Sequence, residues 1–364
     1  MSYKTLIMNM GSTSTKVAVY EDENLVWKEV IEHPREEITK FLKYMDQYDY
    51  RRGEIMKKLK AHGEELSGFS AFVSRGGTIR PVPGGTWYIT DKMLYDSQSG
   101  VYGDHPCNIG GQIAYDMAKE NGVCALTVDP PICNEQIPEA AYSGLPGIVR
   151  LASFQALNHR AIARKFAADV KTPYEELNII VAHLGGGISV AAHEKGKIID
   201  VNNALAGDGP FAMERSGGLP VGSLIELCYS NKYSCEELLR LVNGRGGVYA
   251  YLGIADGRKI DEMISSGDKK AEEVIKAMAY QTSKEIAALG AAFKGKVDAI
   301  VLTAGLAHWK YLTDLIADRV SYLAPLHIYP GENEMESLAI GAYRVLSGAE
   351  NPKNYDELYT SDKA

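Results

Sequence analysis

The chain has 364 residues, of which 45% are hydrophobic and 24% are charged, and its formal net charge is −8. This length exceeds what one compact core usually holds, so we expect two domains. The negative charge, with no basic patch visible, argues against nucleic acid or an anionic membrane surface as a partner. The basic residues Arg51, Arg52, Lys57, Lys58 and Lys60 have helical spacing, and we interpret them as a solvated helix face.

A repeat begins at the N-terminus. Residues 6–19 align without a gap with residues 180–193, so that Asn9 stands opposite His183, 174 positions later. Each copy has an apolar run, a turn rich in glycine and hydroxyl groups, and a second apolar run, which predicts a strand, a turn and a returning strand. An offset near half the chain length predicts a duplicated α/β domain.

The remaining elements alternate between helical and strand patterns, as an α/β class requires. In chain order we predict helices at 36–43, 54–62, 111–120, 147–168, 221–229, 234–243, 269–292 and 311–323, and strands at 69–74, 125–128, 299–303 and 327–329. A last helix at 336–346 is expected to cross back and close the first domain. The polar tail, 347–364, is expected to be loosely held.

These patterns predict two duplicated α/β domains. The first would comprise residues 1–130 with 337–364, and the second, nucleotide-binding domain residues 131–336. Two such domains would leave a nucleotide cleft lined by both glycine turns, because consecutive backbone N–H groups bind anions. Closure about hinges near 130 and 337 would exclude water.

The first glycine turn offers groups that suit a phosphoryl group. The chain has neither a P-loop motif nor a G-x-G-x-x-G fingerprint. Asn9, Ser12, Ser14 and Lys16 instead supply an amide, two hydroxyls and an ammonium within one turn. A solvated hairpin loop would explain the same residues equally well.

The second glycine turn is His183-Leu-Gly-Gly-Gly187. Gly185, Gly186 and Gly187 let the backbone approach a ligand where no Cβ would fit. A β-bulge and a satisfied core histidine are the alternatives. The alignment of His183 with Asn9 favours a position that faces a ligand.

Two arginines, Arg75 and Arg215, each precede glycines, and their guanidinium groups match carboxylate or phosphate oxygens. Surface ion pairing is the commoner use of arginine. A further glycine turn, Gly305-Leu306-Ala307-His308, follows an apolar strand, where adenosine could lie against the backbone.

Acidic residues provide candidates for a magnesium site. Asp129 ends the strand 125–128 and precedes two prolines. Mg²⁺ commonly uses one or two carboxylates together with water and phosphate oxygens. Glu332, Glu334 and Glu336 offer a second carboxylate, although three acids in five residues also suit a solvated helix start.

Together these motifs resemble the acetate/butyrate kinase family of the actin-like superfamily, over essentially the whole chain. Gly186 and the stretch Gly207-Asp-Gly-Pro-Phe211 resemble its butyrate kinase branch. The resemblance implies reversible, Mg²⁺-dependent phosphoryl transfer between ATP and the carboxylate of a short-chain fatty acid, with an acyl phosphate and ADP as products. It also implies a cytoplasmic enzyme, and it identifies the two duplicated α/β domains as actin-like domains of the ribonuclease H-like type with a nucleotide cleft between them.

The resemblance suggests a role for each candidate residue. Asn9, Ser12, Ser14 and Lys16 would line the phosphoryl path, Arg75 and Arg215 would hold the carboxylate and neutralise charge, and His183 would bind phosphoryl oxygens. Asp129 and Glu336 would serve the Mg²⁺, with Asp129 also placed to orient the nucleophile. Gly185 to Gly187 and Gly305 to His308 would contact ADP.

One position departs from the family pattern. Gln155 stands where the family usually has a histidine that stabilises the transition state, and an amide can donate a hydrogen bond but cannot carry positive charge. His159 lies one helical turn later on the same face and could compensate.

Two alternative functions share the fold: a kinase that acts on a hydroxyl group, and a non-catalytic nucleotide-gated protein. The paired arginine–glycine motifs favour a carboxylate substrate. We expect a homo-oligomer of open size. The apolar helix face within 221–227 suits either an oligomer interface or a core, and we interpret it first as core.

Overall fold

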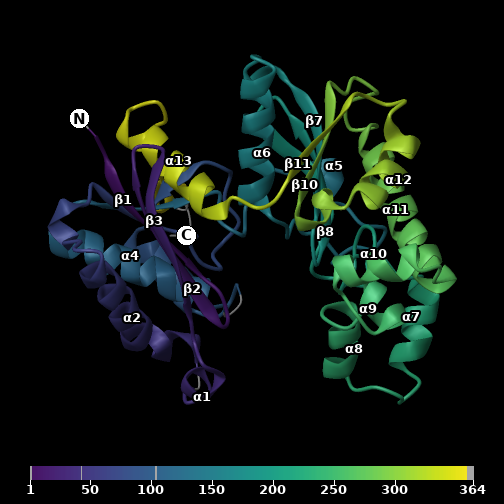
Figure 1. Cartoon of the computed structure of the whole chain (residues 1–364), viewed down its shortest axis with the longest axis horizontal. Helices are drawn as coiled ribbons and strands as arrows, with labels where there is room; N and C mark the ends of the chain where they lie inside the picture. The colour runs from purple at the N-terminus through teal and green to yellow at the C-terminus, as the bar shows by residue number, and fades with distance from the viewer. Residues whose placement is uncertain (1, 42, 103–104, 359–364) are drawn as a thin grey trace. The chain divides into compact units, whose positions relative to one another are not determined.

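The computed structural model describes residues 2–41, 43–102 and 105–358. The chain divides into two compact units (Figure 1): unit 1 comprises Met1–Cys133 with Asn333–Ala364, and unit 2 comprises Asn134–Glu332.

Unit 1 is built on a seven-stranded sheet in the order β12-β5-β6-β4-β1-β2-β3. Its strands are β1 (Lys4–Met10), β2 (Ser14–Glu21), β3 (Asn24–Glu32), β4 (Ala71–Ser74), β5 (Thr86–Tyr88), β6 (Cys124–Val128) and β12 (Lys353–Asn354). Its helices are α1 (Arg35–Ile38), α2 (Tyr48–Ala61), α3 (Asp91–Gln98), α4 (Cys107–Asn121), α13 (Glu334–Leu346) and α14 (Tyr355–Leu358), with 3₁₀ turns η1 (Tyr44–Gln47) and η2 (Leu66–Gly68).

Unit 2 is built on a five-stranded sheet in the order β11-β10-β7-β8-β9. Its strands are β7 (Asn178–Leu184), β8 (Ile188–Glu194), β9 (Lys197–Val201), β10 (Ala299–Ala304) and β11 (Leu326–Pro330). Its helices are α5 (Pro138–Ala141), α6 (Ala156–Asp169), α7 (Val221–Cys228), α8 (Cys235–Val242), α9 (Gly247–Leu252), α10 (Gly257–Ser265), α11 (Lys269–Leu289) and α12 (Lys310–Val320), with 3₁₀ turns η3 (Tyr174–Glu176) and η4 (Gly305–His308).

The predicted duplication is confirmed by the topology. In unit 1 the strands β3, β2 and β1 are antiparallel neighbours, and β4 and β6 continue parallel to β1. In unit 2 the strands β9, β8, β7, β10 and β11 have the same order and the same directions. Register shifts recur at matching places, Val19/Tyr20 and Ala192/His193.

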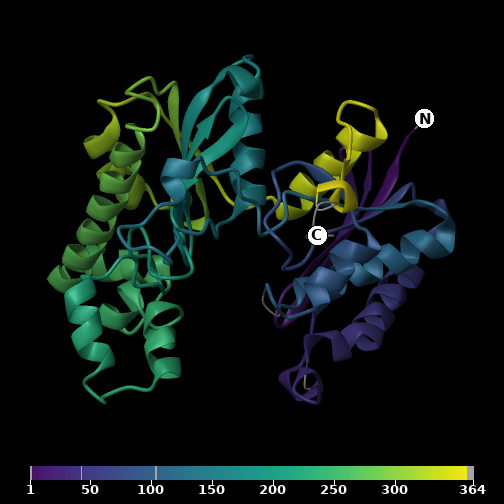
Figure 2. The same ribbon diagram turned by 180° about the vertical axis from the view of Figure 1, so that it is seen from behind.

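Helices cover both faces of each sheet (Figures 1 and 2). Alternate residues of a strand point to opposite faces. In unit 2, Ile179, Val181 and Val301 therefore pack with the α6 residues Ala163 and Phe166. The alternate residues Ile180, Ala182 and Leu302 pack with α11 on the opposite face. In unit 1, α4 and α13 occupy the corresponding faces.

Two predicted helix ranges are wrong in extent. The helix predicted at 147–168 begins only at Ala156, because Gly147 has φ 87° and Val149 forms a bridge with Tyr142. The helix predicted at 36–43 ends at Ile38, while residue 42 lies outside the described part of the chain.

The interpretation of the 221–227 helix as core is also wrong. Helix α7 has no buried residue, and Val221 and Ile225 are 68% and 53% exposed. The polar tail is better held than predicted, since the fully buried Tyr355 donates to Asp96 Oδ2 at 2.7 Å. Residues 359–364 of the predicted tail lie outside the described residues.

All five cysteines are free thiols. Within residues 2–41, 43–102 and 105–358, none of the helices combines the length and the apolar character that a membrane span needs.

Candidate active site

In unit 1 three predicted site residues lie at one edge of the sheet. Strands β1, β4 and β6 are parallel neighbours. Asn9 lies near the carboxyl end of β1, Arg75 directly follows β4, and Asp129 directly follows β6. The carboxyl ends of parallel strands are a common position for ligand sites, because side chains from several strands converge there.

Glu334 connects two of these residues. One carboxylate oxygen, Oε2, accepts from the Asn9 amide at 2.6 Å, and the other, Oε1, lies 3.2 Å from Arg75 Nη1. Asn9 is 5% exposed, and the carboxylate is largely buried. The first turn of α13 thereby holds both the Asn9 amide and the Arg75 guanidinium through one carboxylate.

Glu336, the predicted metal ligand, lies in the same first turn of α13. Its charge acts on Tyr20: burial and, secondarily, Glu336 raise the pKa of the Tyr20 hydroxyl. Of the three acids that the sequence offered, Glu334 contacts Asn9 and Arg75, and Glu332 lies 3.2 Å from His183 Nε2.

The β1–β2 hairpin carries the other predicted residues of unit 1. Lys16 pairs with Asn9 across the hairpin, so both side chains leave the sheet on the same face. Ser12 is exposed and lies in the connecting turn, and Ser14 is half-buried at the start of β2. The hairpin thus brings the predicted hydroxyls and the ammonium into one segment.

Arg51 is buried and bonds the backbone of this turn. The interpretation of Arg51 as part of a solvated helix face is therefore wrong. The side chain on α2 is 0% exposed. Its guanidinium donates to the carbonyl oxygens of Gly11, Ser12 and Ser14 at 3.0, 3.1 and 3.3 Å, and also to Thr15 Oγ1 at 3.1 Å. Because its carbonyls bond inward to Arg51, the turn has a fixed conformation.

The buried His33 beside this turn makes unit 1 sensitive to acid. Its ring bonds Thr15 Oγ1 at 2.8 Å, and burial together with the Arg51 charge lowers the pKa of His33 to about 4. Between about pH 6.5 and pH 4 the unfolded chain takes up a proton at His33 that the folded chain does not bind. The stability provided by neutral His33 is therefore complete above about pH 6.5 and is lost as the pH falls.

We expect the free energy of unfolding of unit 1 to fall by about 2 kcal/mol more in the wild type than in His33→Gln between pH 7.5 and pH 5. Urea unfolding in a Trp309→Phe background measures unit 1, because the two remaining tryptophans, Trp27 and Trp87, lie there. Equal pH dependence in both proteins would contradict the assignment.

Asp129 is 2% exposed and has φ 42°, an uncommon backbone conformation for a residue with a side chain. Its Oδ1 accepts from Gly85 N at 2.7 Å, and its own N–H donates to Gly85 O at 3.0 Å. The carboxylate is thus fixed at the strand end by the neighbouring loop. Strained backbone of this kind occurs often at functional sites.

In unit 2 the triple glycine lies between two predicted site residues, His183 and Arg215. A Cβ on Gly185 would lie 3.1 Å from His183 Nε2, whereas a Cβ on Gly187 would lie 1.9 Å from Arg215 Nη1. The Arg215 guanidinium also donates to Ala204 O at 2.8 Å. Burial lowers the pKa of Arg215, only partly opposed by Glu214. The geometry therefore brings together an imidazole, a side-chain-free backbone turn and a guanidinium.

We expect Gly187→Ala to displace the Arg215 guanidinium and to lower kcat by about 10- to 100-fold, because misplacing a charged group by about 1 Å costs about 100-fold in such reactions. Thermal unfolding should change little, since the displaced atoms end a flexible side chain. Gly222→Ala is the control, because a Cβ there meets nothing within 4 Å. Unchanged kcat in Gly187→Ala would show that the Arg215 position is not critical.

His183 has oxygen partners on both ring nitrogens. Nδ1 lies 2.8 Å from Asn158 Oδ1, and Nε2 lies 3.2 Å from Glu332 Oε1. The ring is 3% exposed. Both ring nitrogens of His183 therefore face oxygen atoms, and Asn158 on α6 fixes the orientation of the ring.

His159 cannot supply the charge that Gln155 lacks. It is 0% exposed and bonds Ser189 Oγ at 2.8 Å. Burial, and then the neighbouring His193 and His183, lower its pKa well below the usual value for histidine. The hypothesis that His159 compensates as a cation is therefore not supported by its surroundings. Gln155 itself is half-buried and precedes α6.

The predicted adenosine turn borders a cavity of about 640 Å³ in unit 2. Gly305, Leu306 and His308 line it, whereas Ala307 is buried behind them. Ala304, directly before the turn, has φ 73°. Sequence reasoning missed the remaining walls of this cavity, which are Ala255, Asp256, Gly257, Arg258, Asp261 and Trp309.

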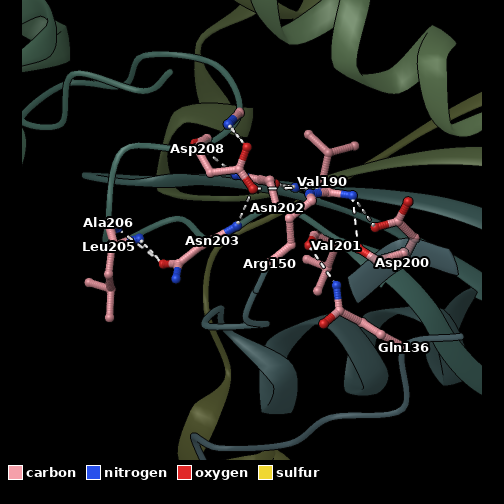
Figure 3. A network of polar contacts seen from close by, with 12 residues as sticks. Gln136, Arg150, Val190, Asp200, Val201, Asn202, Asn203, Leu205, Ala206 and Asp208 are labelled. Carbon is pink, nitrogen blue, oxygen red and sulfur yellow. Dashed lines mark hydrogen bonds and ion pairs between the residues drawn. The ribbon is translucent and has the colours of Figure 1, made fainter. Parts of the chain in front are cut away.

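The segment 207–211 is fixed by a network of polar contacts (Figure 3). Asp208 accepts from the backbone N–H of Asn203 at 3.1 Å and of Gly209 at 2.9 Å. Arg150 lies 3.7 Å from Asp208 and 3.6 Å from Asp200. Burial raises the pKa of Asp200 despite Arg150. This network anchors the loop that leads to Arg215.

Residues 133–335, more than half of the chain, match the model of the acetokinase family. The chain belongs to the acetokinase family. Enzymes of this family are carboxylate phosphotransferases.

Solved structures share the fold of this acetokinase-family chain. The acetate kinase of Porphyromonas gingivalis is 19% identical with a TM-score of 0.77, covering 94% of this chain and 100% of that one. A propionate kinase from Francisella tularensis subsp. tularensis is 18% identical with a TM-score of 0.72, covering 93% and 98%. The acetate kinase of Entamoeba histolytica is 17% identical with a TM-score of 0.72, covering 93% and 98%.

Asp129 and the acids in the first turn of α13 lie in unit 1 and carry the oxygen ligands that Mg²⁺ prefers. Among residues 2–41, 43–102 and 105–358, no three His, Cys, Asp or Glu side chains gather as metal ligands. Mg²⁺ typically takes one or two carboxylates and obtains its remaining ligands from water and phosphate. The donor set around Asp129 and the first turn of α13 is consistent with that use.

Proposed function

We propose that this acetokinase-family enzyme transfers the γ-phosphoryl group of ATP to the carboxylate of a short-chain fatty acid, butyrate or a branched analogue. The reaction would run in reverse to form ATP from ADP and the acyl phosphate. The packing of the Arg215 guanidinium directly on Gly187, next to His183, carries the proposal. It offers a guanidinium, an imidazole and an open backbone where a phosphoryl group could bind.

The chemistry requires no strong base, because a carboxylate is already a nucleophile. Catalysis then depends on alignment and on neutralising negative charge. In unit 2 we assign His183 and Arg215 to the transferring phosphoryl group and Gly185 to Gly187 to the nucleotide phosphates. In unit 1 we assign Asn9 and Lys16 to the phosphoryl path, with Ser12 and Ser14, and Arg75 to the substrate carboxylate.

We assign magnesium to Asp129 together with an acid from the first turn of α13. Glu336 is the residue that the sequence suggested. The contacts of Glu334 with Asn9 and Arg75 support Glu334 as a second candidate. When bound, the metal would neutralise phosphate charge, while Asp129 would keep its position through Gly85.

The cavity at Gly305 to His308 supports ATP and ADP as co-substrates. Trp309 donates to Asp261 at 2.6 Å, so the indole is held at one wall of the cavity, which a purine ring could contact. Asp256 caps helix α10 through the N–H groups of Arg258 and Lys259.

Butyrate or a branched acid is proposed on the basis of two segments, Gly186 and Gly207 to Phe211. A Cβ on Gly186 would lie 3.3 Å from Glu214 Oε2, so a larger residue there would require Glu214 to move. Because Gly186 has no side chain, this site differs in shape from a site that has a polar side chain at this position.

An acyl-hydroxamate assay tests the proposal. Purified protein with MgATP and linear or branched acids of two to six carbons should yield hydroxamate, with four-carbon or branched acids preferred. A best rate with acetate would overturn the butyrate assignment. No product with any acid, but ADP formation with sugars, would instead favour a kinase that acts on hydroxyl groups.

We also propose that the enzyme is a cytoplasmic homo-oligomer. The exposed apolar residues of α7, Val221 and Ile225, support a surface that a second subunit could cover. Light scattering coupled to size-exclusion chromatography should give a mass of at least twice 39.8 kDa. A monomeric mass would refute this part of the proposal.

A further inference from the structure

A chain of buried polar side chains leads from the interior of unit 2 to Gln155. Ser189 Oγ donates to Gln155 Oε1 at 2.7 Å, and His159 Nε2 lies 2.8 Å from Ser189 Oγ. His193 Nε2 lies 3.5 Å from His159 Nδ1, and the Tyr174 hydroxyl lies 2.8 Å from His193 Nδ1. The function proposed above uses none of these four interior residues.

The arrangement follows from the fold. Ser189 and His193 are four residues apart on β8, so they point to the same face of the sheet. In the β7–β8 register Ser189 lies opposite His183, and Ile179 lies opposite His193. This is the face on which α6 packs, so α6 brings His159 onto the two β8 side chains.

Both interior histidines are neutral at physiological pH. His159, His193 and Ser189 are 0% exposed and Tyr174 is 4% exposed. Burial lowers the pKa of His159 and of His193 well below the usual value, and in His193 the positive charges of Arg160 and Arg164 add to the effect. Each ring therefore carries one proton, and one of its nitrogens donates while the other accepts.

The direction of every hydrogen bond in this chain then follows from the bond between Ser189 and Gln155. An amide oxygen only accepts, so Ser189 donates to Gln155 and must accept from His159 Nε2–H. His159 Nδ1 is then free to accept from His193 Nε2–H. His193 Nδ1 in turn accepts from the Tyr174 hydroxyl. All four bonds point the same way, toward Gln155.

We infer that Tyr174, His193, His159 and Ser189 form a one-directional hydrogen-bond relay that fixes the Gln155 amide with its NH₂ group toward the substrate. The inference rests on the proposed function, because the acceptor would be an oxygen of the phosphoryl or carboxylate group. Gln155 Nε2 makes no hydrogen bond within the described part of the chain. The four interior residues are positioning residues, and only Gln155 would touch the substrate.

The relay explains how an uncharged residue can serve at this position. Free glutamine would present its oxygen and its NH₂ group about equally, and the oxygen would repel a phosphoryl group. Because Gln155 Oε1 accepts from Ser189, the Gln155 NH₂ group faces the substrate. This donor does not depend on a proton that the side chain could lose.

Kinetics of the full-length enzyme test the relay. Ser189→Ala should lower kcat for hydroxamate formation by about 10- to 50-fold with the KM for ATP within about twofold, and Ser189→Thr, which keeps the hydroxyl, should recover most of the loss. Tyr174→Phe, at the far end, should lower kcat by about 3- to 10-fold. Gln155→Glu, which presents only acceptors, should lower kcat more than Gln155→Ala.

A second measurement does not depend on activity. ¹⁵N-histidine NMR at pH 7, with signals assigned by single His→Gln variants, should show His159 and His193 as neutral Nε2–H tautomers. An imidazolium or an Nδ1–H tautomer at His159 would overturn the relay. Wild-type kcat in both Ser189→Ala and Tyr174→Phe would also overturn it. If the wild type phosphorylates no acid, the proposed function fails, while the NMR result still decides whether the relay exists.

Discussion

Arg215→Lys is expected to lower kcat for acyl phosphate formation by about 100- to 1000-fold. The guanidinium uses one nitrogen, Nη1, to donate to Ala204 O, and its planar group lies against the backbone of Gly187. A lysine ammonium is a point charge that cannot bond Ala204 and still present a second fixed donor. The loss should therefore fall on kcat more than on the KM for ATP.

The matched control is Arg245→Lys. Arg245 is exposed and lies two residues after Asn243, which forms a β-bridge with Arg215, and its backbone N–H bonds Arg240 O. Its replacement should leave kcat within about twofold and leave the thermal midpoint unchanged. Steady-state hydroxamate kinetics on both variants would test whether the Arg215 guanidinium is needed for catalysis. An Arg215→Lys enzyme with near-normal kcat would contradict the assigned role.

Arg51→Met is expected to lower the free energy of unfolding of unit 1 by about 3 kcal/mol and to lower activity as well. Methionine provides an apolar side chain of similar length, but it lacks the donors to Gly11, Ser12 and Ser14. Each buried acceptor that loses a charged donor lowers the free energy of unfolding by about 1–3 kcal/mol. The loss is smaller where water can replace the donor. The released turn should then sample other conformations.

The neighbouring residue supplies the control. Arg52 is partly exposed and pairs with Glu120 at 2.6 Å, an arrangement that contributes about 0–1 kcal/mol. Urea unfolding of Arg51→Met and Arg52→Met in the Trp309→Phe background, alongside hydroxamate kinetics in the native background, compares the two. Similar small effects in both variants would indicate that Arg51 does not hold the turn.

The sequence by itself determined the duplicated hairpin, the α/β class and the positions of the glycine turns. These features are local: a strand–turn–strand pattern is written in about 14 consecutive residues, and a glycine requirement appears at the residue concerned. His183, Gly185 to Gly187 and Arg215 were predicted as site residues for this reason, since glycines mark both segments.

Only the tertiary structure decided which charges are buried and which polar groups meet. Helical spacing placed Arg51 on a charged face, but its burial results from a turn about 40 residues earlier in the chain packing onto α2. Glu334 and Asn9 are 325 positions apart, so no local pattern could select Glu334 from three neighbouring acids. The neutral state of His159 likewise depends on β8 lying against α6. Burial and pairing are properties of segments brought together by folding, and periodicity along one segment does not contain them.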